Sequence, residues 1–193
     1  MGKILEERDD VQFVEPVVPQ KDVKMKVGFA EAAKWKSKVD GAEYEAIKLT
    51  LSIDDASVRT QHADAKPRRT IEDQFNLVRY PYADKNTGET KWMNRNKLFE
   101  IETAFGFEPS FVDGSGNQIE AYVTKNGNKV APKVEGVKRI LNQDFFDAYF
   151  TEDGTPKMEN WAEKVVYADI DLQTSEKFGD KNVISRYKKA PLV

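Results

Sequence analysis

Residues 164–191 read KVVYADIDLQTSEKFGDKNVISRYKKAP, and two segments of this stretch alternate apolar with polar side chains. The segments are Val165–Leu172 and Asn182–Tyr187, and the polar connection between them contains Gly179. A period of two is typical of a strand with one buried face, and a short polar connection with glycine favours a turn. The stretch therefore predicts a β-hairpin near the carboxyl end. Its second strand ends in the run Arg186, Tyr187, Lys188 and Lys189.

The clearest single strand is YEAIKLTLSI, residues 44–53, in which apolar and polar residues alternate from Ile47 onward. A further strand is expected in the second half of TIEDQFNLVRYPY, where it would run to Tyr80 and stop at Pro81. A helical turn fits Thr70–Asn76 as well as a strand does, so this segment stays open. A short strand is expected at Ile119–Val123, between two turn-rich stretches.

Three segments have the spacing of helices. Residues 29–38, FAEAAKWKSK, are expected to form a short helix. Leu98–Phe105 places apolar side chains three and four residues apart and stops at Gly106, which is typical of an amphipathic helix. Val137–Phe150 is a further helical candidate. Together the elements predict a mainly β fold with inserted helices, of the α+β class, built as a small twisted barrel or sandwich with the helices at one end.

Length and composition indicate a folded protein with a single core. The chain has 193 residues, and its eleven Phe, seven Tyr and three Trp exclude a disordered chain. No apolar run approaches the length of a membrane span, and the start MGKILEERDD lacks a secretory apolar region. Cysteine is absent, which excludes disulfides and thiolate metal sites. We therefore expect a cytoplasmic protein that does not contact a membrane.

The net charge of −3 is unevenly distributed along the chain. Residues 1–22 hold three basic and six acidic side chains, and two prolines in VEPVVPQ prevent a regular helix there. These residues are expected to form an extended acidic arm. Residues 23–193 are then formally neutral, so an anionic partner is neither required nor excluded. The grouping of the cations on one surface would decide the question.

Few residues of this chain could support catalysis. His62 is the only histidine, which excludes a histidine-pair metal site, and its polar loop favours an ordinary solvated side chain. Asp169 and Asp171 would share one face of a strand and could hold Mg²⁺, although solvated carboxylates fit the same pattern better. The sequence therefore predicts a non-catalytic protein with no cofactor and no metal. A Mg²⁺-dependent nuclease is the weaker alternative.

Aromatic and basic residues lie together in four short runs, which is typical of surfaces that hold single-stranded nucleic acid. Bases stack on such rings, at about 1–3 kcal/mol per base, while cations meet the phosphates. Aromatic residues are also common core fillers, so each ring has a purely structural interpretation as well. The candidate stacking rings are Trp35, Tyr80, Tyr82, Trp92 and Tyr187. The candidate phosphate contacts are Lys34, Lys36, Arg68, Arg69, Arg95, Arg186 and Lys188.

The order of these segments resembles the single-stranded-DNA-binding proteins that phages encode with their replication and recombination genes. The similarity covers roughly residues 40–110 and 160–190. It rests on YEAIKLTLSI, QFNLVRY, RNKLFEIETAFGFEPSF and a spacing in the closing hairpin. That spacing falls on Val166, Ala168, Ile170, Phe178, Gly179, Asn182, Ile184 and Tyr187. The resemblance implies an oligonucleotide-binding (OB) β-barrel over residues 23–193 that coats single-stranded DNA, with an insertion around residues 112–160.

The leading hypothesis is a non-enzymatic single-stranded-DNA-binding protein of OB type, acting in phage replication or recombination in the host cytoplasm. Its partners would be single-stranded DNA and, through the acidic arm, replication or recombination proteins. The arm is alternatively a mimic of the nucleic-acid strand that covers the groove. An oligomer is left open. The alternative from another class is a structural or protein-interaction module whose rings fill the core and whose lysines only solubilise it.

Overall fold

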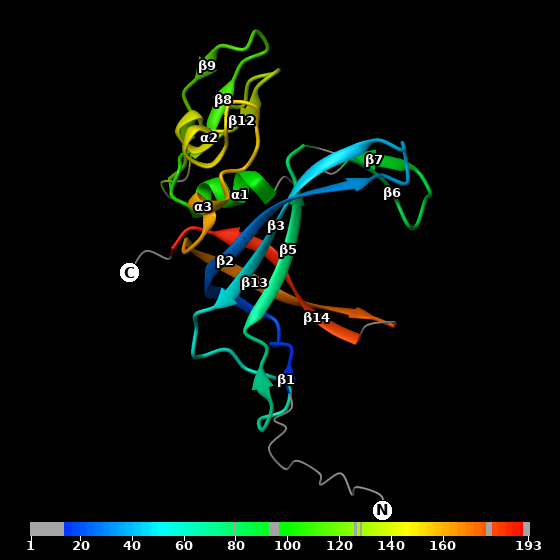
Figure 1. The fold of residues 1–193 in the computed structure, drawn as a ribbon. Helices are drawn as coiled ribbons and strands as arrows, with labels where there is room; N and C mark the ends of the chain where they lie inside the picture. The colour runs from blue at the N-terminus through cyan, green and yellow to red at the C-terminus, as the bar shows by residue number, and fades with distance from the viewer. Residues whose placement is uncertain are drawn as a thin grey trace, which may run out of the picture.

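The computed structural model describes residues 14–78, 80–92, 97–125, 127, 129–176 and 179–190 (Figure 1). Its centre is a five-stranded antiparallel sheet. The order across the sheet is β14 (Gly179–Lys188), β13 (Val165–Ser175), β2 (Gln20–Lys36), β3 (Glu43–Ile53) and β5 (Thr70–Asn76). Strands make up 49% and helices 11% of the described residues, which confirms the expected mainly β fold.

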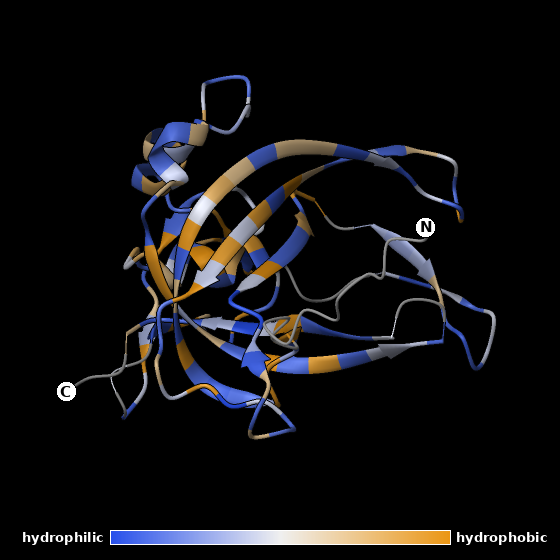
Figure 2. Cartoon of the chain, turned by 60° about the horizontal axis from the view of Figure 1, so that its bottom comes forward, coloured by the Kyte–Doolittle hydropathy of each residue, from blue (hydrophilic) through white to orange (hydrophobic). Residues whose placement is uncertain are grey.

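Alternation along the strands places one face of the sheet in the core, as the orange and blue bands of the long strands show (Figure 2). Buried side chains of this inner face include Val23, Met25 and Val27 in β2, Ile47, Leu49 and Leu51 in β3, and Val166, Ala168 and Ile170 in β13. A β-bulge at Gly28 inserts one residue into β2, so the pairing of that strand with β3 shifts between Val27 and Phe29. Beyond the bulge, odd-numbered residues of β2 therefore lie on the opposite, outer face.

The chain between α1 (Lys97–Ala104) and β13 forms an inserted layer at one end of the sheet, in which α2 and α3 pack on the core while β8, β9 and β12 project away from it (Figure 1). The elements of this layer are β8 (Ser110–Val112), β9 (Gln118–Ile119), β10 (Tyr122–Val123), β11 (Lys129–Val130), β12 (Lys138–Ile140), α2 (Gln143–Tyr149) and α3 (Met158–Trp161). Trp161 is fully buried, and its ring lies 6.5 Å from that of Phe75 in β5 and 6.2 Å from that of Phe145 in α2. These rings attach the layer to the inner face of the sheet.

The remaining strands are short. β1 (Val14–Glu15) pairs in parallel with β4 (Lys66–Pro67), and β6 (Pro81–Ala83) forms a hairpin with β7 (Thr90–Trp92). None of the helices in the described part of the chain has the length and apolar character needed to cross a bilayer.

Most of the expected elements are present, but one helix is wrong and two strands have different bounds. β5 ends at Asn76 and not at Tyr80, and the expected strand over Ile119–Val123 is divided between β9 and β10. The closing hairpin, the strand over residues 44–53 and the helix that ends near Gly106 are confirmed, and Thr70–Asn76 is a strand. The helix expected over residues 29–38 is wrong, because this segment forms the second half of β2 and pairs with β3. Pairing along an existing strand outweighs the modest helix preference of alanine and lysine.

The helix expected over Val137–Phe150 is shorter in the structure. Lys138–Ile140 pairs with β8, and α2 begins only after Asn142, whose side chain accepts a hydrogen bond from the Phe145 amide. Asparagine at this position satisfies an amide that has no partner within the helix, so it sets where the helix starts.

The two edge strands of the sheet, β5 and β14, contact each other through side chains. The five strands do not close through backbone hydrogen bonds in the described residues, so a closed barrel is not shown. Asp73 of β5 instead accepts a hydrogen bond from the Tyr187 hydroxyl of β14 at 2.8 Å. Lys97 of α1 donates to both oxygens of Asp73, at 2.7 and 2.9 Å, and to the carbonyl of Ile184 at 2.9 Å. We call this group of Asp73, Lys97 and Tyr187 the seam.

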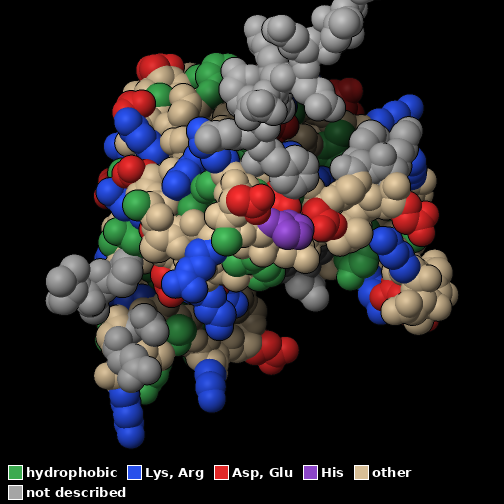
Figure 3. All heavy atoms as spheres, turned by 90° about the horizontal axis from the view of Figure 1, so that it is seen from below, with side chains coloured by type: hydrophobic (Ala, Val, Ile, Leu, Met, Phe, Trp, Pro, Cys, Tyr) green, Lys and Arg blue, Asp and Glu red, His purple; other side chains and the backbone are tan. Residues whose placement is uncertain are grey.

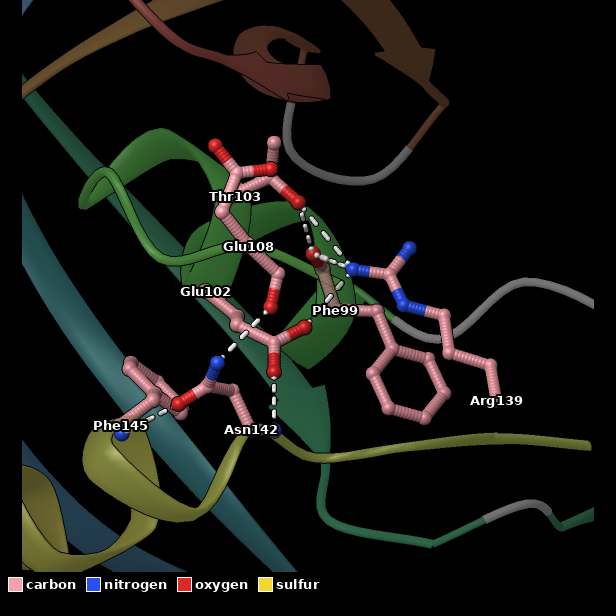
Figure 4. Close-up of polar contacts among 7 residues, drawn as sticks. All are labelled: Phe99, Glu102, Thr103, Glu108, Arg139, Asn142 and Phe145. Carbon is pink, nitrogen blue, oxygen red and sulfur yellow. Dashed lines mark hydrogen bonds and ion pairs between the residues drawn. The ribbon is translucent and has the colours of Figure 1, made fainter. Parts of the chain in front are cut away.

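A buried carboxylate fastens the inserted layer to α1 (Figure 4). Glu102 is fully buried, and it accepts hydrogen bonds from the Asn142 amide and, at 2.7 Å, from Arg139 Nη2. The same Arg139 nitrogen donates to the Phe99 carbonyl, and its guanidinium lies over the Phe99 ring at 4.6 Å. Burial raises the pKa of Glu102, and this effect outweighs the opposing effects of the Asn142 amide and of Arg139.

The end of the expected arm is part of the core. Val17 is fully buried, and the Asn182 side chain bonds both its amide and its carbonyl, at 2.8 and 2.6 Å. The Glu15 carbonyl accepts a hydrogen bond from the Arg68 backbone amide at 2.7 Å, and the Glu15 carboxylate lies 2.6 Å from His62 Nδ1. Figure 3 shows the histidine, in purple, beside acidic side chains on the underside of the molecule. Residues 1–13 of the expected arm lie outside the described residues.

The contact between His62 and Glu15 should make the attachment of residues 14–18 depend on pH. Glu15 raises the pKa of His62, so this stabilisation is complete below about pH 6.5 and is lost as the pH rises through the raised pKa. His62 lowers the pKa of Glu15. The stabilisation from the Glu15 carboxylate is therefore complete above about pH 4.5 and is lost as the pH falls through the lowered pKa. Amide exchange of Val17 and Val18, corrected for intrinsic rates, should accelerate as the pH rises through the raised pKa of His62. His62→Gln should remove that pH dependence, and an unchanged profile in this variant would contradict the assignment.

Candidate nucleic-acid interface

Three aromatic rings lie together on the outer face, at the end of the β2–β3 hairpin. Trp35 stacks on Tyr44, with ring centroids 5.4 Å apart and planes at 26°, and Tyr80 meets Trp35 edge-on at 5.1 Å. All three side chains are half-buried. Tyr44 donates to Asp40 at 2.7 Å, which raises the pKa of its hydroxyl. We call Trp35, Tyr44 and Tyr80 the aromatic platform.

The indole of Trp35 lies across β3, and a small residue makes room for it. Trp35 pairs with Tyr44, while Ala46 of β3 pairs with Asn76 of β5 in the next outward-facing row. The Trp35 Nε1 group donates to the Asn76 side chain, so the indole spans from β2 to β5 over the position of Ala46. Ala46 is 1% exposed although it belongs to the outer face. Packing over Ala46 and the hydrogen bond to Asn76 therefore hold the Trp35 ring in place.

A fourth ring, Phe29, extends this surface along β2. Its side chain is 56% exposed, and it faces Thr50, with Lys48 as its diagonal neighbour on the same face of β3. Phe29 and Trp35 are six residues apart, which corresponds to about 20 Å along a strand. Sequence analysis missed Phe29 because residues 29–38 were expected to form a helix. Recognising KVGFAEAAKWK as a strand with a glycine bulge would have shown that Phe29 and Trp35 share a face.

Strand geometry separates the lysines that flank Trp35 from its ring. Lys34 and Lys36 pair with Glu45 and Glu43, in the rows that face inward, whereas Trp35 faces outward. Lys34 also lies 3.4 Å from the Glu43 carboxylate and 3.6 Å from that of Glu45. The run Lys34-Trp35-Lys36 therefore does not form one aromatic and cationic surface, because neighbours in a strand point to opposite faces.

The β6–β7 hairpin carries two further candidate rings near the platform. Tyr82 is half-buried and pairs with Lys91, whereas Trp92 is 54% exposed and pairs with Pro81, the residue that follows Tyr80. Lys91 lies 2.6 Å from the Asp84 carboxylate. Arg95, a candidate phosphate contact, lies outside the described residues.

Tyr187 is a wrong prediction. Its side chain is 3% exposed, and its hydroxyl belongs to the seam, so no base can stack on it. Burial, with Asp73 and Glu100 nearby, holds its pKa well above the usual range. Ser185 is an extra residue of β14 at the point where the register shifts between Asp169 and Ile170, and this β-bulge brings Tyr187 to the inner face together with Ile184. The periodicity of the strand alone placed this ring on the opposite side from Arg186 but did not show which side was buried.

The other candidate cations lie away from the platform. Arg68 and Arg69 precede β5, at the end of the sheet opposite Asn76. Arg186 is exposed on β14, two strands from β2, and pairs with Asp169. Lys188 lies 2.6 Å from the Asp169 carboxylate and 2.9 Å from that of Asp22, and both contacts raise its pKa. The cations expected at one surface are therefore spread over three places.

Asp169, one of the two carboxylates considered as ligands for Mg²⁺, has other partners in the structure. Lys188 and the Asp22 amide occupy the Asp169 carboxylate, so its partners are a cation and a donor. In the described part of the chain, no group of three or more histidine or carboxylate side chains could hold a metal ion.

A scan against protein-family models, a search of curated proteins and a search of solved structures each found no match to this chain.

Proposed function

We propose that this protein binds single-stranded nucleic acid without catalysis, on the outer face of an OB-type sheet. The chain order supports the OB assignment. Three strands, β2, β3 and β5, are followed by α1 and then by β13 and β14, and β13 returns to lie beside β2. The OB fold is a five-stranded, partly open barrel. The seam joins the edge strands β5 and β14 at the place where such a barrel would close.

The aromatic platform carries the proposal. OB folds bind oligonucleotides on the face of their second and third strands and on the adjoining loops, and here these strands are β3 and β5. Tyr44 lies on β3, and Trp35 reaches from β2 to Asn76 of β5 on the same side of the sheet. Tyr80 follows β5 in the chain and packs on Trp35, and the turn over residues 37–42 that joins β2 to β3 adjoins these rings. Phe29 on β2 and Trp92 on β7 add exposed ring surface. Half-buried rings held in place by Asn76 and Asp40 would receive bases with little loss of side-chain freedom.

Replacing Trp35 by alanine should weaken binding of a fluorescently labelled oligo-dT by about 5- to 150-fold, the loss expected when one base loses its stacking partner. Anisotropy at low salt measures the affinity. The log of the wild-type affinity should fall linearly with log salt, by about 0.7 for each phosphate contacted.

Tyr122→Ala is the matched control, because Tyr122 is 62% exposed but lies on β10, away from the platform. Its affinity should equal that of the wild type. Absence of wild-type binding at low salt, or equal losses in the Trp35 and Tyr122 variants, would overturn the proposal and favour a protein-interaction module.

A further inference from the structure

The outer face between the rings is locally anionic. Lys48 lies between two carboxylates, 3.5 Å from Glu31 and 3.4 Å from Glu72. The carboxylates are the more exposed partners, since the side chains of Glu31 and Glu72 are 46% and 64% exposed and that of Lys48 is 34% exposed. One cation and two anions therefore share the path from Phe29 to Trp35.

Duplex DNA and single-stranded DNA would bind differently to an anionic face that carries aromatic rings. Duplex DNA carries one negative charge per about 1.7 Å of axis, and non-specific duplex binding comes almost entirely from neutralised phosphates. A single strand can instead stack its bases on rings, and this contribution does not depend on charge. Bases of a duplex are already stacked and paired, so Phe29 and Trp35 offer them little.

We infer that Glu31 and Glu72 determine specificity by disfavouring duplex DNA, so that the outer face accepts single strands through its rings. This inference rests on the proposed function. In β2 and β5 the two carboxylates lie on either side of Lys48, and they keep its ammonium group from acting as a free phosphate contact. A duplex could gain affinity at this face only through charge, and the charge of the face is net negative. A single strand gains affinity by stacking its bases on the rings, even though the face is net negative.

The test compares affinities for oligo-dT and for a duplex of the same length in the wild type and in the Glu31→Gln/Glu72→Gln double variant. The variant leaves Lys48 unpaired, so duplex affinity should rise by about 5- to 10-fold and its salt dependence should steepen by about one phosphate contact. Affinity for oligo-dT should rise less, so the ratio of single-strand to duplex affinity should fall by about threefold or more.

Glu120→Gln/Glu135→Gln is the control, because it changes the net charge equally at two exposed positions of the inserted layer. It should leave the ratio unchanged. A ratio that stays constant in the Glu31/Glu72 variant, or falls equally in the control, would overturn this inference while the proposed function stands. Failure of the wild type to bind oligo-dT would overturn both.

Discussion

Replacing Glu102 by alanine should lower the free energy of unfolding by about 3–5 kcal/mol, as measured by urea denaturation. Glu102 is fully buried, and the substitution leaves the Asn142 amide without its acceptor and Arg139 without its carboxylate. An unpaired buried donor retains its full desolvation cost, and the lost side chain leaves a cavity. Because these contacts join α1 to the start of α2, amide exchange should rise first in Gln143–Tyr149.

Glu102→Gln separates charge from hydrogen bonding at the same position. The amide keeps one acceptor for the Asn142 backbone, so the loss of stability should be smaller than in the alanine variant. Burial raises the pKa of Glu102, so the native state holds this proton more tightly than the unfolded chain. Wild-type stability should therefore fall as the pH rises through the raised pKa, and the glutamine variant should lack that slope. Equal stability of the wild type and the alanine variant would contradict the anchoring role.

Replacing Asp73 by alanine should cost about 3 kcal/mol of stability, because the substitution removes the acceptor at the centre of the seam. Tyr187 is buried, so its hydroxyl would keep no partner, while Lys97 would retain only the Ile184 carbonyl. The edge strands β5 and β14 have no backbone hydrogen bonds to each other in the described residues, so the side chains of the seam hold these two strands together. Urea denaturation measures the loss, and amide exchange in β14 measures the opening.

Tyr187→Phe is the matched variant for the seam. It keeps the buried ring and removes one hydrogen bond, so its cost should be about 1 kcal/mol, clearly below that of Asp73→Ala. Both seam variants should bind oligo-dT as the wild type does at temperatures where they remain folded, because the rings of the platform lie elsewhere. A selective loss of binding in Tyr187→Phe would show instead that Tyr187 has a direct role.

The candidate site was predictable in part. Trp35 and Tyr80 were chosen as rings beside cations, and the structure places them together, although they are 45 residues apart in the chain and the contact could not be read from spacing. The lysine neighbours of Trp35 were misassigned, because a helix was expected where β2 continues. Phe29 was missed for the same reason, and Tyr44 was missed because only the register of β2 against β3 brings it beside Trp35.

Binary patterning in the sequence by itself determined the mainly β class, the closing hairpin and α1, because periods of two and of about 3.6 residues record which side of an element meets the core. Tertiary structure alone decided the exposure of each ring. Tyr187 became a core residue through the bulge in the hairpin and its bond to Asp73, and Trp35 became part of a platform through Asn76. The physical reason is that bulges and long-range polar contacts change which side of a strand is buried, and the alternation of apolar and polar residues does not specify the partners of a strand across the sheet.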